Sequence, residues 1–386
     1  MSRCIFFLTG ARSEYDILYP VIKAVSARAG LRAEVIAAAA HLSPLHGMTV
    51  ELIRQDGFPI AGEIDSLLPE ETWEGRSRSF ARLVDGLTQL LATNRPDVLF
   101  VAGDREEPLA GAIVANFLRI PVAHLHGGDR CIASDVDEVL RPAISKLAHL
   151  HFTATEGHRE RLIRMGEHPE TVWVSGAPGL DRLRDEPDVP AETLAEIYGV
   201  DVHQPFFILI QHPSSTLNPE AGGREMETIL EGILSLGHPV FCSYPNTDPG
   251  NQLIRAAIDE MQYHHPQLIV YNTLPRSHFV ALYRRCTAIV GNSSSIVIES
   301  GFLKAPGILV GPRQNLRETG PNVLRVEATY QAVRDACLRA LEDKAFKRTV
   351  REAPSLYGDG HAAERIAEVL ANVELSPDLL LKTMAY

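Results

Sequence analysis

Short apolar runs alternate with amphipathic stretches along most of the chain. Residues 4–9 form the first apolar run, and residues 15–29 then carry apolar side chains at helical spacing. Apolar strands that alternate with helices are typical of parallel α/β layers, because the connecting helices cover both faces of the sheet. In the first half, the pattern predicts further strands at 33–40, 97–102, 122–125 and 150–154, and helices at 77–94, 107–117 and 136–148.

The alternation stops at residues 185–191, where the sequence DEPDVPA is acidic and contains proline. We interpret this segment as a linker between two domains. The pattern then restarts and predicts strands at 206–210, 240–243, 268–271, 288–290 and 307–310, and helices at 224–236, 252–262, 277–285, 295–303, 330–341 and 361–372. We therefore expect an α/β protein in which two Rossmann-like domains face each other across a cleft, with ligands at the carboxyl ends of the strands.

The composition excludes several classes of protein. A length of 386 residues suits two domains, and 45% hydrophobic with 22% charged residues indicates a folded chain. A net charge of −12 without any Lys/Arg block argues against a nucleic-acid partner. No apolar stretch approaches the roughly 20 residues that a membrane-spanning helix needs. Five scattered cysteines without CxxC spacing argue against disulfides and a zinc site, so we expect a cytoplasmic protein.

The first strand is followed by the loop TGARSEY, residues 9–15. A glycine turn at the start of a helix offers backbone N–H groups to an anion, and Arg12 adds a guanidinium. The alternative is an ordinary turn with a surface arginine. The loop is not GxGxxG, so the sequence gives little support for a dinucleotide cofactor.

Acidic side chains and histidines follow the next strands of the first half. In GDREE, Asp104 and Arg105 come directly after a strand, although Asp104 would also suit the start of the next helix. In HLHGGD, alternation along the strand places His124 and His126 on the same face. Groups of this kind at one strand end suit proton transfer at carbon. A divalent metal site and a structural role for both histidines are the alternatives.

The second half offers groups that suit a diphosphate. His212 lies in QHP, and the segment YPNTDPG ends the next strand. Successive serines in GNSSS, residues 291–295, lie between a strand and a helix, where hydroxyl and backbone donors can bind phosphate or simply cap the helix. Glu299, about one turn into that helix, could accept hydrogen bonds from ribose hydroxyls, and Arg313 adds a cation at a further strand end.

In this order, the segments TGARSEYD, HLSPLHGMT, GDREE, HLHGGD, DEVLRPAISKLAHLHF, QHP, YPNTDPG, GNSSS…E and GPRQNLRE resemble the hydrolysing UDP-N-acetylglucosamine 2-epimerase family. This family includes bacterial enzymes of sialic and legionaminic acid synthesis. The resemblance covers nearly the whole chain and implies a GT-B fold, with an N-terminal domain at 1–186 and a nucleotide-binding domain at 187–360. It also implies that the C-terminal helix, within 361–386, packs back on the first domain, and that the protein forms homodimers or homotetramers and uses no metal or organic cofactor.

The same resemblance implies roles for individual residues. Asp104, His126 and Asp137 match acid–base positions of the family, and Asp129 and Glu138 are orienting or alternative groups. The residues that the resemblance implies in nucleotide-sugar binding are Arg12, Arg105, His212, Asn246, Ser293, Ser294, Glu299 and Arg313.

This sequence departs from the family pattern at several of these positions. Residue 126 is His where some relatives have Glu, Asp129 replaces the usual glutamate after the paired glycines, and Pro142 replaces a histidine. The assignment of base and acid therefore stays open. Ile296 replaces a glycine of the serine loop, and we expect it to alter how closely that loop approaches the base or ribose.

The expected reaction is the conversion of UDP-N-acetylglucosamine to N-acetylmannosamine and UDP through a glycal, within the synthesis of sialic-type sugars. Cations would assist departure of the diphosphate while a side chain removes the proton at C2. The alternative substrate for the same reaction is UDP- or GDP-linked N,N'-diacetylbacillosamine. A GT-B glycosyltransferase, a non-hydrolysing epimerase and a nucleotide-sugar sensor without catalysis are the alternative functions.

Overall fold

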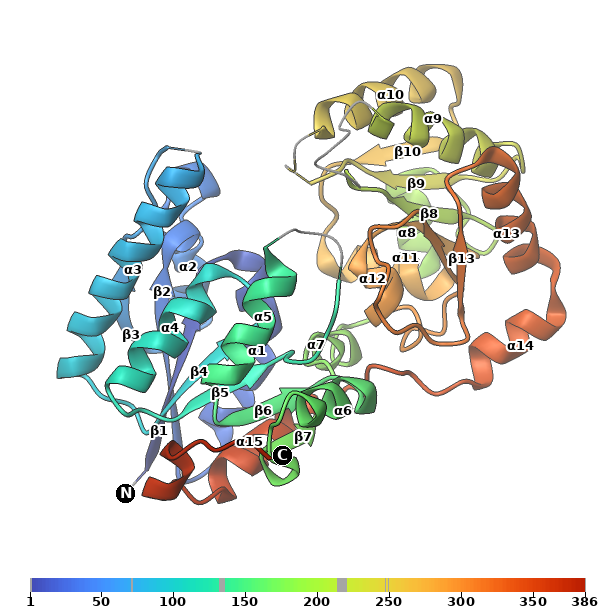
Figure 1. Ribbon diagram of the computed structural model, residues 1–386. Helices are drawn as coiled ribbons and strands as arrows, with labels where there is room; N and C mark the ends of the chain where they lie inside the picture. Colours follow the sequence, from blue (N-terminus) through green and yellow to red (C-terminus); the bar gives the residue numbers. More distant parts are fainter. Residues whose placement is uncertain are drawn as a thin grey trace. The chain divides into compact units, whose positions relative to one another are not determined.

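Two parallel β-sheets are built from the apolar runs of the sequence (Figure 1). The computed structural model describes residues 2–70, 72–131, 136–213, 221–246, 248 and 250–385, without the side chain of residue 137. These residues form two compact units. Unit 1 consists of residues 1–129, 135–182 and 358–386, and unit 2 consists of residues 130–134 and 183–357.

The sheet of unit 1 has seven strands in the order β3-β2-β1-β4-β5-β6-β7, in which every pairing is parallel. The strands are β1 (Arg3–Thr9), β2 (Leu31–Ala38), β3 (Ile60–Ile64), β4 (Val98–Ala102), β5 (Val122–Leu125), β6 (Leu150–Thr153) and β7 (Val172–Val174). The helices are α1 (Arg12–Ala27), α2 (Val50–Gln55), α3 (Trp73–Thr93), α4 (Glu106–Phe117), α5 (Asp137–Leu147), α6 (Glu156–Arg164), α7 (Gly179–Arg184), which runs into unit 2, and α15 (Ala362–Asn372).

The alternation of side chains along β1 explains why the sheet is covered on both faces. Ile5 and Phe7 join a buried cluster with α1, α2 and α15, whereas Phe6 and Leu8 join another with α3, α4 and α5. All four side chains are buried. Burial on both faces requires continuous apolar strands, which is the pattern that the sequence shows.

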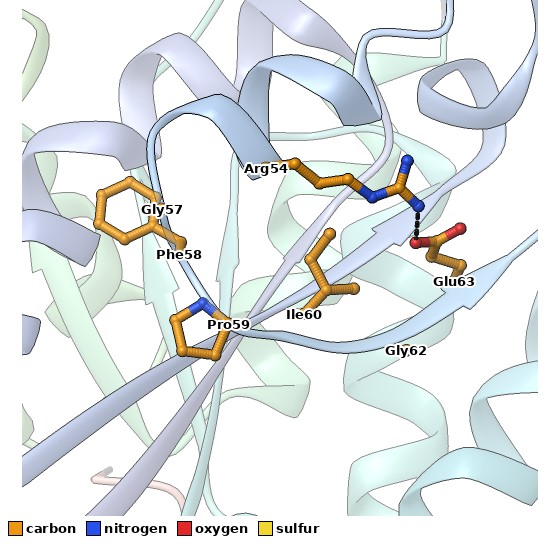
Figure 2. A pocket seen from close by; sticks show the side chains of 7 residues that line it. All are labelled: Arg54, Gly57, Phe58, Pro59, Ile60, Gly62 and Glu63. Atoms are coloured by element: carbon orange, nitrogen blue, oxygen red, sulfur yellow. Dashed lines mark hydrogen bonds and ion pairs between the residues drawn. The ribbon is translucent and has the colours of Figure 1, made fainter.

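The segment between α2 and β3 forms a surface hollow of about 630 Å³ at the amino end of β3 (Figure 2). Figure 2 shows Arg54 reaching Glu63, with which it forms an ion pair, beside Phe58 and Pro59. The lining continues along β3 to Glu63, so the hollow follows the outer edge of the sheet, whereas ligands of parallel sheets bind beyond the carboxyl ends of the strands.

The end of the chain completes unit 1. Helix α15, red in Figure 1, packs against α1, and its Ile366 and Leu370 join the cluster under β1. Asp181 accepts hydrogen bonds from the backbone N–H groups of Ala362 and Ala363, at 3.0 and 2.6 Å, and thereby caps the start of α15.

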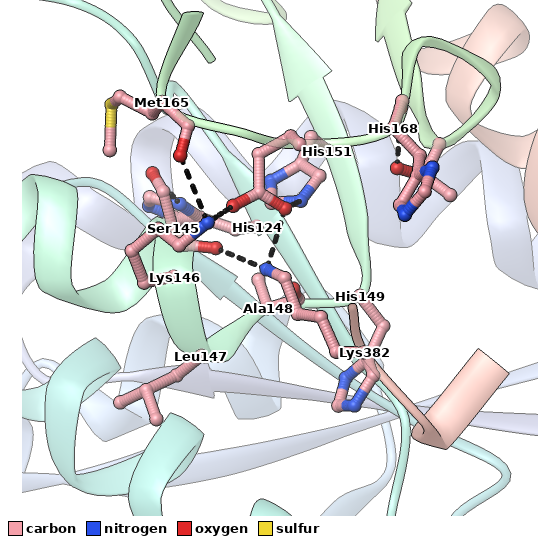
Figure 3. Close-up of polar contacts among 12 residues, drawn as sticks. His124, Ser145, Lys146, Leu147, Ala148, His149, His151, Met165, His168 and Lys382 are labelled. Carbon is pink, nitrogen blue, oxygen red and sulfur yellow. Dashed lines mark hydrogen bonds and ion pairs between the residues drawn. The ribbon is translucent and has the colours of Figure 1, made fainter. Parts of the chain in front are cut away.

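A buried charge cluster holds the segment that follows α15. Figure 3 shows Lys146, His151 and Lys382 converging, and the group that joins them is the Glu167 carboxylate. Its oxygens lie 2.6 Å from Lys146 Nζ, 2.6 Å from Lys382 Nζ and 3.0 Å from His151 Nε2. These partners hold the pKa of Glu167 at about 2, despite the opposing effect of burial. Lys382 therefore ties the C-terminal segment to β6 and α5.

The sheet of unit 2 repeats the arrangement with six parallel strands in the order β10-β9-β8-β11-β12-β13. The strands are β8 (Phe207–Ile210), β9 (Val240–Ser243), β10 (Leu268–Tyr271), β11 (Ala288–Gly291), β12 (Gly307–Val310) and β13 (Val323–Val326). The helices are α8 (Ala191–Tyr198), α9 (Ala221–Leu234), α10 (Asn251–His264), α11 (Arg276–Arg285), α12 (Ser294–Ile298), α13 (Tyr330–Glu342) and α14 (Lys344–Glu352). Counted from its own first strand, each sheet begins with the strand order of a Rossmann fold.

The structure differs from the pattern-based prediction in three outer strands and in several helices. Strands β3, β7 and β13 were missed, because all three lie at sheet edges and few of their side chains are fully buried, which weakens the apolar signal. The short helices α2, α6, α7, α8 and α14 were also not predicted. Helix α12 is shorter than the predicted 295–303 and ends at Ile298. Among the described residues, we find no helix that is long and apolar enough to span a membrane.

Candidate active site

Parallel pairing brings the loops after β1, β4 and β5 to one edge of the sheet in unit 1. These loops carry Arg12, Asp104, Arg105, His126 and Asp129. The exposed fractions of the Arg12 and Arg105 side chains are 64% and 51%, so both guanidinium groups are accessible to an anion. Asp137 and Glu138 begin α5; the Asp137 side chain lies outside the described residues, and Glu138 is half-buried.

Arg141 joins two of the predicted catalytic carboxylates. Its Nη2 forms an ion pair with Asp104 Oδ2, and its Nη1 lies 3.7 Å from Asp129 Oδ2. The Arg141 side chain is only 4% exposed and also donates a hydrogen bond to the backbone oxygen of His126, at 3.3 Å. On the other side of Asp129, His158 Nε2 lies 3.4 Å from Oδ1. Arg141 therefore orients Asp104 and Asp129 relative to each other.

The two histidines of HLHGGD lie in different environments, so the prediction that they share a strand face was wrong. Strand β5 ends at Leu125, and His126 has a φ of 66°, which turns the chain away from the extended conformation. His124 is buried and hydrogen-bonded to the Gly103 backbone oxygen (2.8 Å) and Ser145 Oγ (3.1 Å). Burial lowers the pKa of His124 to about 3, so this imidazole is neutral. His124 supports the loop that carries Asp104.

The second glycine of the HLHGGD motif, Gly128, is required by the backbone conformation and by a close contact with α6. Its φ is 76°, and a Cβ atom there would lie 2.3 Å from the His158 backbone oxygen. Only glycine allows this approach of the loop to α6. The contact places Asp129 beside His158.

Two buried glutamates at the end of β1 were not among the predicted site residues. The Gly10 N–H donates to Glu14 Oε2 at 2.6 Å, and a Cβ atom on Gly10 would lie 2.4 Å from Glu107 Cγ. Both carboxyl groups therefore pack around Gly10. Burial, with the nearby Glu107 charge, raises the pKa of Glu14 to about 8. The available signal was the spacing of Gly10 and Glu14, since a glutamate in the first helical turn commonly reaches back to a preceding N–H.

In unit 2, Asn292 organises the ends of β8 and β11. Its Oδ1 accepts from the His212 N–H and its Nδ2 donates to the His212 backbone oxygen, both at 2.8 Å. The Asn292 backbone oxygen in turn accepts from Gln314 Nε2 at 3.0 Å and from Arg313 Nη1 at 3.4 Å. Asn292 is fully buried and was not a predicted site residue. It fixes His212 and Arg313 relative to each other.

The hydrogen bonds of His212 determine which nitrogen carries its proton. Burial, with the nearby Arg313 charge, lowers the pKa of His212 to about 4, so the imidazole is neutral. The Asn246 N–H donates to His212 Nδ1 at 3.2 Å, so Nδ1 is the acceptor and Nε2 carries the hydrogen. His212 can therefore donate a hydrogen bond from Nε2 to an anion. Arg313 Nη2 also lies 3.6 Å from Asp248 Oδ2.

The serine loop follows β11 through Gly291, whose φ is 124° and where a Cβ atom would lie 2.1 Å from the Ile210 backbone oxygen. Ser293 Oγ accepts from the Ser295 N–H at 3.3 Å and thereby caps α12, of which Ser294 is the first residue. Glu299 lies at the C-terminal end of this short helix, where its N–H still donates a helical hydrogen bond to the Ser295 backbone oxygen at 2.8 Å. Burial raises the pKa of Glu299, and the Arg276 charge opposes this rise.

Ile296 does not extend from the serine loop towards a ligand. Its side chain is fully buried, and a Cβ atom on Gly307 would lie 2.9 Å from Ile296 Cγ2. The expectation that Ile296 alters how closely the loop approaches a ligand therefore finds no support in its packing, since the side chain is directed to β12. Among the described residues, no group of three or more histidine, cysteine or acidic side chains is arranged to hold a metal ion.

Comparison with known proteins identifies a family and several proteins that share this architecture and these motifs. The family profile described as UDP-N-acetylglucosamine 2-epimerase matches residues 23–371. The UDP-N,N'-diacetylbacillosamine 2-epimerase (hydrolyzing) of Legionella pneumophila is 35% identical over 386 residues, all of both chains. The GDP/UDP-N,N'-diacetylbacillosamine 2-epimerase (hydrolyzing) of Campylobacter jejuni is 27% identical over 90% of this chain and 89% of its own.

Solved structures agree with these matches at the level of the fold. The UDP-GlcNAc 2-epimerase from Neisseria meningitidis, bound to UDP-GlcNAc, superposes with a TM-score of 0.79 at 18% identity, over 96% of this chain and 99% of that one. The predicted GT-B fold class, built from two Rossmann-like parallel sheets, is confirmed. The chain belongs to the UDP-N-acetylglucosamine 2-epimerase family. The predicted class of enzyme, a hydrolysing nucleotide-sugar 2-epimerase, is confirmed.

Proposed function

We propose that this enzyme acts on UDP-N,N'-diacetylbacillosamine, inverts C2 of the sugar and releases UDP together with the free 2-epimer, in the synthesis of a sialic-type sugar. The observation that carries this choice of sugar is the full-length match, at 35% identity, to the hydrolysing Legionella enzyme of that name. UDP-N-acetylglucosamine, the substrate favoured by the sequence motifs, is the second candidate, supported by the 26% identity to the UDP-N-acetylglucosamine 2-epimerase of Neisseria meningitidis.

In the first stage, the C2 proton passes to a side chain of unit 1, the C1–O bond breaks, and its electrons leave with the diphosphate. The C–H electrons form the C1–C2 double bond of a glycal. Asp104, held by Arg141, is our candidate for the proton acceptor. His126, Asp129, Asp137 and Glu138 remain candidates for the second proton transfer.

The leaving diphosphate would be stabilised by fixed donors of unit 2. His212 Nε2–H, Arg313 and the serine loop with Ser293 and Ser294 supply them, and Asn246 fixes the His212 ring. Donors that are already oriented need no reorganisation when charge develops on the leaving group. Glu299 is assigned to the ribose hydroxyls. Arg12 and Arg105, both accessible, are assigned to the phosphate or sugar.

In the second stage, water adds its hydroxyl to C1 and a proton returns to C2 from the opposite face. The test is to incubate the purified protein with each nucleotide sugar in heavy water and to follow the products by NMR. We expect UDP, a free reducing sugar of the manno configuration and deuterium at C2, with faster turnover of the diacetamido substrate. Transfer of the sugar to an acceptor without release of a free epimer would support the glycosyltransferase alternative instead.

A further inference from the structure

A cavity of about 920 Å³ lies at the carboxyl ends of β2, β3 and β4, within unit 1. Its walls come from residues 39–46, residues 65–70, Thr72, one face of α3 and the start of α4. Pockets for small ligands commonly measure about 300–1,000 Å³. Arg105, Glu106 and Glu107 line this cavity, so one wall continues directly from the loop that carries Asp104. This cavity lies at the carboxyl ends of the strands, where ligands of parallel sheets bind, whereas the hollow of Figure 2 follows the outer edge of the sheet.

The walls of this cavity are largely apolar. Leu42, Leu68, Phe80 and Leu83 line it. Several of its polar side chains already have partners in the protein. Glu106 pairs with Arg76 at 2.9 Å, and Ser79 Oγ accepts from the Leu68 N–H at 3.0 Å. The occupant that fits such walls carries apolar groups and needs few hydrogen bonds from the protein.

Two large apolar side chains of this cavity are exposed to solvent. The exposed fraction is 85% for Leu45 and 79% for Trp73, and both residues line the cavity. In contrast, Leu83 and Leu87 on the same helix as Trp73 are buried in the core. Exposed large apolar side chains beside a cavity are typical of a ligand site.

The two candidate substrates differ at the edge of the sugar away from the nucleotide. N,N'-Diacetylbacillosamine carries an acetamido group at C4 and a methyl group at C6, where N-acetylglucosamine carries a hydroxyl and a hydroxymethyl group. In a pyranose ring, C4 lies across the ring from C1, which bears the leaving diphosphate. With C2 beside Asp104, the wall formed by Arg105–Glu107 is the adjoining place for the C4–C6 edge.

We infer that this cavity receives the C4–C6 edge of the substrate sugar, and that its apolar wall selects the acetamido and methyl groups over hydroxyl groups. The inference rests on the proposed function, since it concerns the sugar of that same reaction. The methyl groups of the C4 acetamido and of C6 would contact Leu42, Leu68 and Phe80. An apolar pocket that loses one such contact commonly changes selectivity by about 10–200-fold.

The test compares kcat/KM for UDP-N,N'-diacetylbacillosamine and for UDP-N-acetylglucosamine in the wild type and in three variants. Leu68→Gln places an amide in the half-buried wall, and Leu45→Gln changes a side chain that is exposed and lies outside the buried core. Leu90→Gln is the matched control, because Leu90 is, like Leu68, a half-buried leucine, but it lies on α3 at a position that does not line the cavity. We expect Leu68→Gln to lower the preference for the diacetamido substrate about tenfold, mainly through its KM, and Leu45→Gln to lower it less.

In the control we expect an unchanged ratio of the two kcat/KM values. An equal loss with both substrates in Leu68→Gln, or a wild-type ratio near one, would overturn the inference and leave the proposed reaction standing. If neither nucleotide sugar released UDP in the wild type, the proposed function would fail, and the inference with it.

Discussion

The strand ends of the two units carry different chemistry on the same architecture. In unit 1 the side chains are carboxylates, imidazoles and arginines in close pairs, such as Asp104 with Arg141 and Glu14 with Glu107. In unit 2 the organising group is the neutral amide of Asn292, which fixes a neutral His212 and the cation of Arg313. Proton transfer needs groups that can change charge, whereas a leaving diphosphate needs donors that stay fixed. Under the proposed function, the repeated fold would therefore assign proton transfer to unit 1 and diphosphate binding to unit 2.

The largest predicted effect is a loss of kcat when Asp104 of unit 1 is replaced. Asp104→Asn removes the proposed proton acceptor but keeps the size of the side chain, so kcat should fall about a thousandfold while UDP affinity stays within a factor of two or so of wild type. Steady-state kinetics and calorimetric UDP titration measure the two quantities. Asp85→Asn on the exposed face of α3 is the control, and wild-type turnover by Asp104→Asn would remove this residue from the mechanism.

The corresponding change in unit 2 should act on binding. Asn292→Asp keeps an oxygen for the His212 N–H but loses the donor to the His212 backbone oxygen and adds a negative charge beside the proposed diphosphate site. We expect UDP affinity to fall about 10–100-fold, as a buried unsatisfied group costs roughly 1–3 kcal/mol. Asn116→Asp makes the same replacement in unit 1 and should leave UDP affinity unchanged. Equal UDP affinities for Asn292→Asp and the wild type would contradict the assignment.

The buried Glu14 carboxyl of unit 1 also predicts that the free energy of unfolding depends on pH. The pKa of Glu14 is raised from 4.5 to about 8, so its bound proton stabilises the folded state below pH 4.5, and this stabilisation is lost as the pH rises towards 8. Glutamine cannot titrate, so Glu14→Gln should become more stable relative to wild type between pH 5 and pH 8, by on the order of 2 kcal/mol. The groups that face Glu14 and modulate this effect are Glu107 and Arg105.

Denaturant unfolding at the two pH values measures this change, with Glu160→Gln, an exposed glutamate of α6, as the control. A stability difference between Glu14→Gln and wild type that stays constant from pH 5 to pH 8 would argue against a protonated Glu14.

The smallest predicted effect concerns the charge cluster around Glu167, at the amino end of β6 in unit 1. Lys382→Met removes one partner of Glu167 but leaves Lys146 and His151, so the free energy of unfolding should fall by only about 1 kcal/mol. Lys344→Met, on an exposed position of unit 2, should change it less. Thermal unfolding of both variants measures the difference, and an unchanged Tm in Lys382→Met would show that the cluster does not depend on the C-terminal lysine.

The sequence predicted the fold better than it predicted the detail of the site. Continuous apolar strands and helix periodicity revealed the central strands of both sheets, whereas the edge strands β3, β7 and β13 carry too few buried side chains to give that signal. Motif order placed Asp104 and His212 on strand-end loops. It could not show that His126 leaves the strand direction, because a positive φ at a non-glycine residue depends on the packing around it.

The supporting residues were harder to find. Asn292 and Glu14 act through hydrogen bonds to backbone N–H groups, so their side-chain type gives little indication of their partners. Arg141 contacts Asp104, 37 positions earlier in the chain, and such a pairing is visible only once the helix has been placed against the sheet.

The return of α15 to unit 1 has a consequence for how the protein is made. Residues 1–129 of unit 1 are synthesised before residues 183–357 of unit 2, yet Ile366 and Leu370 belong to the central core of unit 1. Apart from residues 130–134, unit 2 is continuous from residue 183 to residue 357, so all of that stretch emerges before the helix that unit 1 needs. During synthesis, the first unit to begin folding is therefore the last to be completed, and until then α1 exposes the apolar side chains that α15 later covers.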